Sequence, residues 1–330
     1  MTRLSILPAL MVAALAAAAA SVPAFAQAQE LTPVRLRLDW RPGAQHAPFY
    51  YGKAKGLFEA QGIDLEIISG SGSSDTVKQV GSGAVEFGLA DALVLVQATA
   101  QDVPDIAIAA YYQKTPTVVL SPADKPVTSP EQLTGEVKLG NKKGSATSQG
   151  LSAMLSANDI SEEDINAADV GFGVQPLLAG QVDAMMGFAM NEPIEAETAG
   201  MKVSVMPVSD FGVDAYGLTI ITNEGLASSK PDLVKGFLRA TLEAMAATAS
   251  ERDAAVQAVA EAVAEVDTAR EMRVLDLTVP YWIPEGQDAK AIGMQTDERW
   301  QHTAKMAQDV GLVDAAPPTD AIFTTSFMPN

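Results

Sequence analysis

The sequence predicts an α/β protein in which mainly parallel sheets are covered by helices on both faces. Short segments in which apolar and charged residues alternate are typical of strands, and segments with helical features lie between them. Strands that alternate with helices along a chain form parallel sheets. The 330 residues, 48% of them hydrophobic, suffice for one large domain or two of ordinary size.

The first block of elements lies before residue 92. In chain order we expect a strand over 34–38, a helix over 48–59, a strand over 63–68, a helix ending near 83 and a strand over 85–89. Glycines at 62, 70, 72 and 83 separate these elements.

A second block follows residue 121. The run Ser129-Pro130-Glu131-Gln132 has the form of a helix start, with a cap residue, a proline at the first position and a glutamine at the third. A strand over 137–139 and a helix over 147–157 come next. The alanine-rich segment 229–275 is predicted to be helical, since Pro231 lies near its start and the next proline is Pro280.

One pattern occurs twice. Residues 79–91 read as a helix end, a glycine turn, a strand and a carboxylate, and residues 177–192 repeat that order. Any αβ unit can look like this; alternatively, the chain folds into two similar lobes, each with polar residues at the end of a strand.

Residues 1–26 have the features of an export signal. Arg3 precedes an apolar, alanine-rich run over 4–20, and Ala24-Phe25-Ala26 supplies the small-x-small cleavage pattern. A membrane anchor is the alternative, but the run is short for a bilayer span and a cleavage site follows it. We expect cleavage after Ala26 and a periplasmic protein.

Composition narrows the possible functions. Acidic residues number 41 against 22 basic ones, so no basic surface is available for nucleic acid. The chain contains no cysteine, which excludes disulfides, thiolate metal sites and cysteine nucleophiles. Its histidines are His46 and His302, too few for a multi-histidine metal centre. We therefore expect neither a metal nor a cofactor.

Polar and aromatic residues gather at the ends of the predicted strands. In open α/β sheets, ligands bind beyond the carboxyl ends of the strands. Taken singly, Trp40 could be a core residue, Asp91 a helix cap and Glu192 part of a solvated loop. Together these positions describe a ligand-binding cleft, and the candidates are Asp39, Trp40, Ser71, Asp91, Ser145, Thr147, Asn191 and Glu192.

Two loops suggest how a ligand would be held. The glycine–serine loop 144–148 precedes a helix, so its amides and hydroxyls form either an anion or carbonyl-oxygen site or a simple helix cap. Residues 40–51 are rich in aromatic side chains that suit stacking on a flat ligand. His46 in this loop could cap, stack or simply begin a helix. We assign no catalytic residue, because no oriented partner for His46 is evident.

These residues resemble a known family. The matching segments are Asp39-Trp40-x-Pro42-x-x-x-His46-Ala47-Pro48-Phe49-Tyr50, then 54–65, 70–73, 83–91 and 129–135. They are similar to the opening of NMT1/THI5-like (SsuA/THI5-like) solute-binding proteins, and the resemblance extends over about 34–240.

The resemblance implies a type II periplasmic binding protein that delivers a small molecule to an inner-membrane ABC permease and its ATPase. Residues 31–118 and 216–330 would form lobe I and residues 119–215 lobe II. Two β-rich crossover segments, near 112–121 and 208–222, would act as a hinge, with Tyr112 and Tyr216 lining the cleft. We expect a monomer.

The resemblance also implies a range of ligands. The opening looks most like the branch for thiamine-pyrimidine precursors and other flat heterocycles. There, Trp40, His46 and Tyr50 would stack or form hydrogen bonds, and Glu192 would pair with an aminopyrimidine edge. The chain departs from that branch at Gly43 and Ala47. Riboflavin, aliphatic sulfonates, taurine, nitrate, bicarbonate and aromatic acids are the alternatives.

Two other classes compete with transport. The eukaryotic pyrimidine synthases share the implied fold, but they use a cysteine-rich iron motif, which a chain without cysteine lacks. A receptor that docks on a sensor kinase or chemoreceptor would have the same fold and cannot be distinguished by sequence.

Overall fold

The computed structural model describes residues 1–2, 30–171, 173–283 and 286–329, and residues 31–330 form one compact unit. Apart from Met1 and Thr2, the predicted export signal lies outside the described residues. Within the described residues, no helix combines the length and apolar character that a membrane span needs.

The first sheet has the strand order β2-β1-β3-β10-β4. Its strands are β1 (Thr32–Arg37), β2 (Ile63–Ile68), β3 (Phe87–Asp91), β4 (Asp105–Ala110) and β10 (Leu218–Asn223). β1 pairs in parallel with β2 and β3, whereas β10 lies antiparallel between β3 and β4. The α/β prediction is confirmed, and the sheet is mixed because β10 enters it from far along the chain.

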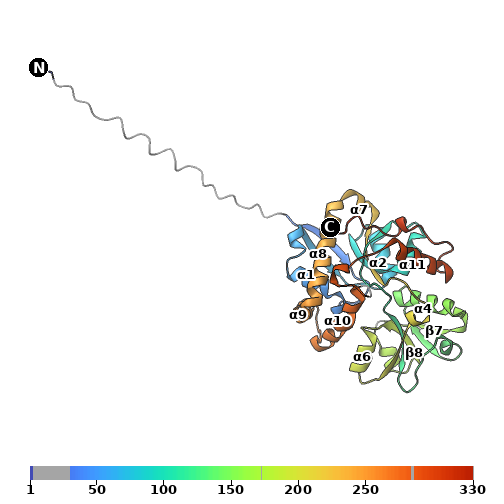
Figure 1. Ribbon diagram of the computed structural model, residues 1–330. Helices are drawn as coiled ribbons and strands as arrows, with labels where there is room; N and C mark the ends of the chain where they lie inside the picture. The colour runs from blue at the N-terminus through green and yellow to red at the C-terminus, as the bar shows by residue number, and fades with distance from the viewer. Residues whose placement is uncertain (3–29, 172, 284–285, 330) are drawn as a thin grey trace. The chain divides into compact units, whose positions relative to one another are not determined.

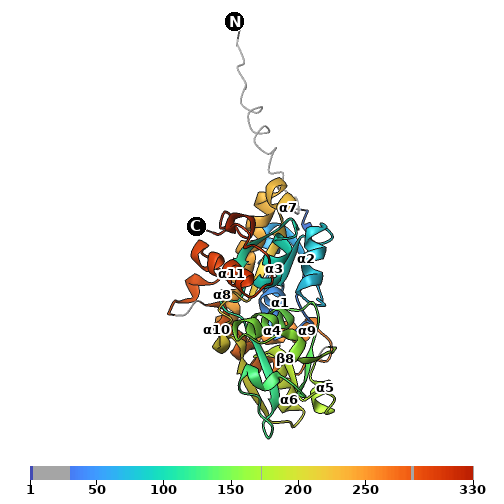
Figure 2. The same cartoon turned by 90° about the vertical axis from the view of Figure 1, so that its right-hand side faces the viewer.

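The second sheet repeats this arrangement, with the order β7-β6-β8-β5-β9. Its strands are β5 (Thr117–Pro122), β6 (Lys138–Asn141), β7 (Asn166–Asp169), β8 (Ala184–Phe188) and β9 (Val203–Pro207). β6 is parallel to β7 and β8, and β5 lies antiparallel between β8 and β9. Figures 1 and 2 both show α4, α6 and β8 grouped apart from α7.

The repeated sequence pattern corresponds to equivalent strands, since β3 and β8 both occupy the third place in their sheets. The chain passes from the first sheet to the second between β4 and β5, and returns between β9 and β10. The second crossing is less β-rich than predicted, because it begins with the 3₁₀ helix Val208–Phe211. Gly212, in the left-handed conformation with a φ of 90°, ends this helix. The lobe boundaries at 118/119 and 215/216 stay a prediction.

Several helices differ from the predicted ones. α1 (Ala47–Ala54) is shorter than predicted because Gly56, with a φ of 70°, turns the chain out of the helix. The capping box at Ser129 forms, but it starts only the 3₁₀ turn Pro130–Leu133. The predicted helical segment 229–275 is three helices: α8 (Pro231–Ser250), α9 (Arg252–Ala262) and α10 (Thr268–Trp282).

The remaining elements cover the sheets. They are α2 (Ser73–Gly81), α3 (Ala92–Thr99), α4 (Ala146–Ala157), α5 (Gln175–Leu178), α6 (Glu192–Thr198), α7 (Glu224–Ser229), α11 (Asp297–Asp309) and the 3₁₀ turns Ala44–His46, Glu59–Gln61, Glu162–Asp164, Ala289–Ala291 and Thr319–Ala321. One core packs α8, α9 and α10 against the first sheet, where the Phe87 and Phe237 rings stack 3.7 Å apart. A second core contains α3, α4 and α11 and takes residues from both sheets.

Candidate functional site

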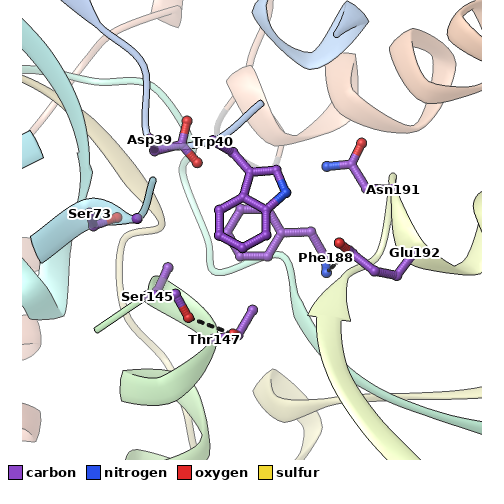
Figure 3. A pocket seen from close by; sticks show the side chains of 10 residues that line it. Asp39, Trp40, Ser73, Ser145, Thr147, Phe188, Asn191 and Glu192 are labelled. Atoms are coloured by element: carbon purple, nitrogen blue, oxygen red, sulfur yellow. Dashed lines mark hydrogen bonds between the residues drawn. The ribbon is translucent and has the colours of Figure 1, made fainter. Parts of the chain in front are cut away.

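A cavity lies where strand ends of the two sheets meet. We call it the inner cavity. Its lining residues are Asp39, Trp40, Gly72, Ser73, Ser145, Ala146, Thr147, Phe188, Asn191 and Glu192. Figure 3 shows the Trp40 indole in the middle of this group, with Asp39 and Ser73 on one side and Asn191 and Glu192 on the other.

Most of these residues follow the ends of four strands, two from each sheet. Asp39 and Trp40 follow β1, Gly72 and Ser73 follow β2, residues 145–147 follow β6, and Asn191 and Glu192 follow β8. The carboxyl ends of parallel strands are the usual ligand-binding edge of such sheets. The inner cavity thus receives residues from both sheets.

Backbone hydrogen bonds fix the chain at Trp40. The Gly70 amide donates to the Trp40 carbonyl (3.0 Å), and the Gly72 amide donates to the Asp39 carbonyl (2.9 Å). The two loops lie so close that a Cβ on Gly70 would be 2.0 Å from the Leu38 carbonyl oxygen. Only glycine allows this approach, so the loop 70–74 supports the loop that carries Trp40.

His46 orients the Asp39 carboxylate. Its Nε2 lies 2.9 Å from Asp39 Oδ1, and both residues are buried. Because a carboxylate can only accept, the Nε2–H donates. His46 does not line the inner cavity; it holds Asp39, which does.

Glu192 begins α6 and faces the inner cavity. Its Oε2 accepts a hydrogen bond from the Phe188 amide (2.7 Å). Burial raises the pKa of this carboxyl to about 7, partly offset by the Phe188 hydrogen bond. Glu192 can therefore accept a hydrogen bond when ionised and donate one when protonated.

The start of α4 contributes hydroxyl groups. Ser145 caps this twelve-residue helix, and its Oγ lies 2.8 Å from Thr147 Oγ1 (Figure 3). A helix N-terminus favours negative or partially negative groups. This edge suits a carbonyl oxygen or an anionic group of a ligand.

The structure brings half of the twelve predicted residues together. Of the described residues that line the inner cavity, those predicted are Asp39, Trp40, Ser145, Thr147, Asn191 and Glu192. Tyr50 is partly buried against the core, which raises its pKa to about 12, and Ser71 is exposed beside the cavity-lining Ser73.

Asp91, Tyr112 and Tyr216 lie elsewhere. The Asp91 carboxylate caps α3 by accepting from the Leu93 amide, while its own amide donates to Ser73 Oγ. Tyr112 is fully buried against Tyr281, at 5.8 Å between ring centroids. Tyr216 packs on Trp300 (5.2 Å) and accepts a hydrogen bond from the Thr296 amide. These three residues are not among those that line the inner cavity, and their contact with a ligand stays a prediction.

Four lining residues were not predicted: Gly72, Ser73, Ala146 and Phe188. Gly72 and Ser73 belong to the loop 70–74, from which only Ser71 was chosen, and Ala146 lies between the predicted Ser145 and Thr147. Phe188 ends β8, the strand of the repeated pattern, and extending the strand-end argument to its last residue would have included it. In the part of the chain that the structure describes, no group of three or more His, Cys, Asp or Glu side chains is placed to hold a metal.

The known proteins that are similar to this chain share one fold, but their names give several classes of ligand. The sequence model of a family described as NMT1/THI5 like matches residues 43–255. The chain is 26% identical over 324 residues to the riboflavin-binding protein RibY of Chloroflexus aurantiacus, covering 96% of this chain and 91% of the relative. It is 26% identical over 218 residues to a formylaminopyrimidine-binding protein of Halalkalibacterium halodurans, covering 65% of this chain and 66% of the relative.

Some enzymes and a sulfonate-binding protein are also similar to this chain. Pyrimidine phosphate synthases of Legionella pneumophila and Saccharomyces cerevisiae share 22% to 26% identity with this chain. The alkanesulfonate-binding protein SsuA of Xanthomonas axonopodis pv. citri superimposes with a TM-score of 0.68 at 15% identity, covering 89% of this chain and 99% of that structure. At that identity the likeness shows the fold alone, which is the type II periplasmic binding protein fold.

Proposed function

The chain belongs to the NMT1/THI5-like family, and on that premise we propose that it is the solute-binding component of an ABC importer. Its ligand would be a small flat heterocycle, a thiamine-pyrimidine precursor or a similar ring, bound in the inner cavity. Its partners would be an inner-membrane permease and the associated ATPase. The protein would reach the periplasm through an export signal cleaved after Ala26.

The position of Trp40 carries this proposal. Its indole lies in the inner cavity beside two buried carboxyl groups, those of Asp39 and Glu192 (Figure 3). An aromatic face stacks on a flat ring, and carboxylates accept hydrogen bonds from amino groups on its edge. The raised pKa of Glu192 also suits an edge that presents a donor beside an acceptor, because the protonated carboxyl can donate.

The relatives support a ring rather than a small anion. RibY and the formylaminopyrimidine-binding protein are both named for flat nitrogen heterocycles. The start of α4, with Ser145 and Thr147, favours a sulfonate or nitrate as the second candidate ligand. Two buried carboxyl groups beside that helix disfavour an anion, so we rank it below the heterocycle.

An enzyme is the less supported class. The relatives include pyrimidine phosphate synthases. The cysteine-rich iron motif of the eukaryotic synthases, however, has no counterpart in a chain without cysteine. A receptor role would use the same inner cavity and differ only in the partner.

Ligand capture would proceed by closure of the two sheets around the inner cavity. Contacts already link them: the Ser74 amide donates to the Gly144 carbonyl (3.3 Å), and Arg273 of α10 pairs with Glu197 of α6 (2.6 Å). A ligand that touches residues of both sheets stabilises the closed form by its additional contacts there.

A thermal-shift screen of the purified protein tests this proposal, after unfolding and refolding to remove carried-over ligand. The panel contains aminopyrimidines, flavins, purines, aromatic acids, taurine, alkanesulfonates, nitrate and bicarbonate. A ligand at ~100 times its Kd adds about 2.7 kcal/mol of stability. We expect a shift with a flat heterocycle; a shift with sulfonates or nitrate alone would refute the heterocycle and leave solute binding.

Variants locate the site. Trp40→Ala and Glu192→Gln should each weaken heterocycle binding at least tenfold, about 1.4 kcal/mol. Trp40→Phe keeps an aromatic face and should lose less. Glu163→Gln, at an exposed position outside the residues that line the cavity, is the control for Glu192 and should bind normally.

A further inference from the structure

The short helix α6 contributes side chains to the cores of both sheets. Its Ala196 belongs to the core of the second sheet. Ile194 and the preceding Met190 belong instead to the core that packs α8, α9 and α10 against the first sheet, and they are 1% and 0% exposed. Separation of the two sheets would therefore expose apolar side chains around α6 to water, which is unfavourable.

An ion pair connects the same helix to α10. Glu197 Oε2 lies 2.6 Å from Nη2 of Arg273, and about half of each side chain is exposed. Ile194 and Glu197 are three positions apart, so they lie on one face of α6. Because Glu197 pairs with Arg273, this face is the one directed toward α10, with a buried apolar contact and an ion pair at its rim.

α10 is in turn tied to the loop that carries Trp40. Glu271, two residues before Arg273, is buried and accepts a hydrogen bond from the Ala44 amide. α10 thus contacts the loop after Trp40 with one side chain and α6 with another. Because Glu192 begins α6, the contact between α6 and α10 also determines where its carboxyl lies relative to Trp40.

The contact between α6 and α10 is separate from the ligand site. Met190, Ile194 and Glu197 are not among the described residues that line the inner cavity. Their contacts stabilise the closed arrangement whether or not a ligand is present. The affinity of a site that exists in only one conformation falls with the population of that conformation, so these contacts raise affinity without touching the ligand.

From this arrangement we propose that Met190, Ile194 and Glu197 form a latch on α10. The latch holds the inner cavity closed, positions Glu192 relative to Trp40 and slows release of the ligand, which leaves after α6 has separated from α10. The account of release rests on the proposed function. The latch itself is a property of the chain without a ligand and is measured in that state.

Distances between two spin labels test the latch in the protein without ligand. Because the chain has no cysteine, Lys202→Cys, just after α6, and Ala254→Cys, on α9, provide two unique and exposed attachment sites. We expect a population with a short distance, which falls at least about tenfold relative to the open one in Ile194→Ala and at least about twofold in Glu197→Lys. Glu197→Lys combined with Arg273→Glu restores opposite charges and should recover the population.

Two controls match these changes. Asp309→Lys makes the same charge change as Glu197→Lys in an exposed ion pair, with Lys305, that lies within the single helix α11. Leu177→Ala removes a buried aliphatic side chain from the core of the second sheet. Both should leave the label distances unchanged, and urea unfolding shows that each variant is folded. A role of Glu197 in folding alone would not be rescued by the exchanged charges.

Binding is measured with riboflavin and with 4-amino-5-hydroxymethyl-2-methylpyrimidine. For a compound that binds, calorimetric titration should show at least about tenfold weaker binding to Ile194→Ala. The loss should be mainly in the rate of release after dilution, because removal of the latch leaves the contacts to the ligand in place. The charge-exchanged protein should release the compound at nearly the unaltered rate.

The outcomes separate the latch from the proposed function. Label distances that are the same in Ile194→Ala, Glu197→Lys and the parent protein would refute the latch, whichever compound binds. Distances that respond while neither compound binds would support the latch and count against the proposed heterocycle. A compound that binds, but leaves Ile194→Ala no faster than the parent, would refute the role of the latch in release.

Discussion

Asp39 Oδ1 lies 2.9 Å from Nε2 of His46, and the histidine is completely buried beneath the carboxylate that it holds. The histidine therefore acts on the inner cavity through Asp39. Among the described residues, Nδ1 of His46 has no hydrogen-bond partner. The pair fixes the direction of this buried carboxylate.

Removing the histidine should destabilise the fold and disturb the cavity. His46→Ala removes this hydrogen bond from the buried Asp39 carboxylate, which costs about 1–3 kcal/mol of folding free energy or more. His302→Ala, at an exposed residue that contacts Asp214, should cost little. Urea unfolding measures both. Equal stability of the two variants would contradict a supporting role for His46.

The pH dependence of stability should report Glu192. Its pKa rises from 4.5 unfolded to about 7 folded, so the folded chain binds the proton more tightly. Its contribution to stability is complete below about pH 4.5 and is lost as the pH rises through about 7, with a slope of at most about 1.4 kcal/mol per pH unit. Glu192→Gln cannot titrate.

Unfolding titrations between about pH 5 and pH 8 should thus show the wild-type chain losing stability relative to Glu192→Gln. Glu163→Gln is again the control and should track the wild type. A constant difference between the wild type and Glu192→Gln across this range would show that the carboxyl titrates normally.

Asp105 is another buried carboxyl, and its effect should be on stability alone. Both of its oxygens lack hydrogen-bond partners among the described residues, and burial together with Glu224 raises its pKa to about 8. Ionisation in the folded state is therefore costly, and stability should fall as the pH rises from about 4 to about 8. Asp105→Asn should be the more stable protein at pH 8 by at least about 1.4 kcal/mol, with a flatter pH profile.

Thermal unfolding at several pH values checks the Asp105 prediction, with the exposed Asp124→Asn as the control. Ligand affinity should be unaffected, because Asp105 is not among the residues that line the inner cavity. A loss of stability in Asp105→Asn at high pH would mean that the carboxylate has a stabilising partner.

The strand ends could be predicted from the sequence because they depend on local patterns. Alternation over 34–38 and 63–68 placed β1 and β2, and Asp39 and Trp40 follow directly. Glu192 followed from the repeated pattern that ends in β8. These are residues whose position is fixed by the end of a strand.

The directions of the two tyrosines could not be predicted in that way. Tyr112 and Tyr216 lie on the crossing segments as predicted, but their rings pack on Tyr281 and Trp300, which come from the last third of the chain. No local sequence pattern predicts packing between residues so far apart in the chain. The break between α8 and α9 was missed for a similar reason: no glycine or proline marks Glu251, whose side chain accepts hydrogen bonds from Tyr51 and Lys55 of the distant α1 segment.

Gly70 supports Trp40 by close approach, so a methyl group there should impair both folding and binding. A Cβ at Gly70 would lie 2.0 Å from the Leu38 carbonyl oxygen and 2.5 Å from the Asp39 carbonyl carbon. Both are backbone atoms, so the loop that carries Asp39 and Trp40 must move. Gly70→Ala should cost about 1–3 kcal/mol of stability or more and weaken heterocycle binding at least tenfold.

Gly83→Ala is the matched control for that change. Gly83 has a φ of 72° but no atom within 4 Å of an added Cβ, so its substitution costs only the backbone strain, about 1–2 kcal/mol. Urea unfolding and calorimetric titration of both variants separate the two effects: Gly83→Ala should lose stability and keep its affinity, whereas Gly70→Ala should lose both. Normal affinity in a folded Gly70→Ala protein would show that the approach of the two loops does not position Trp40.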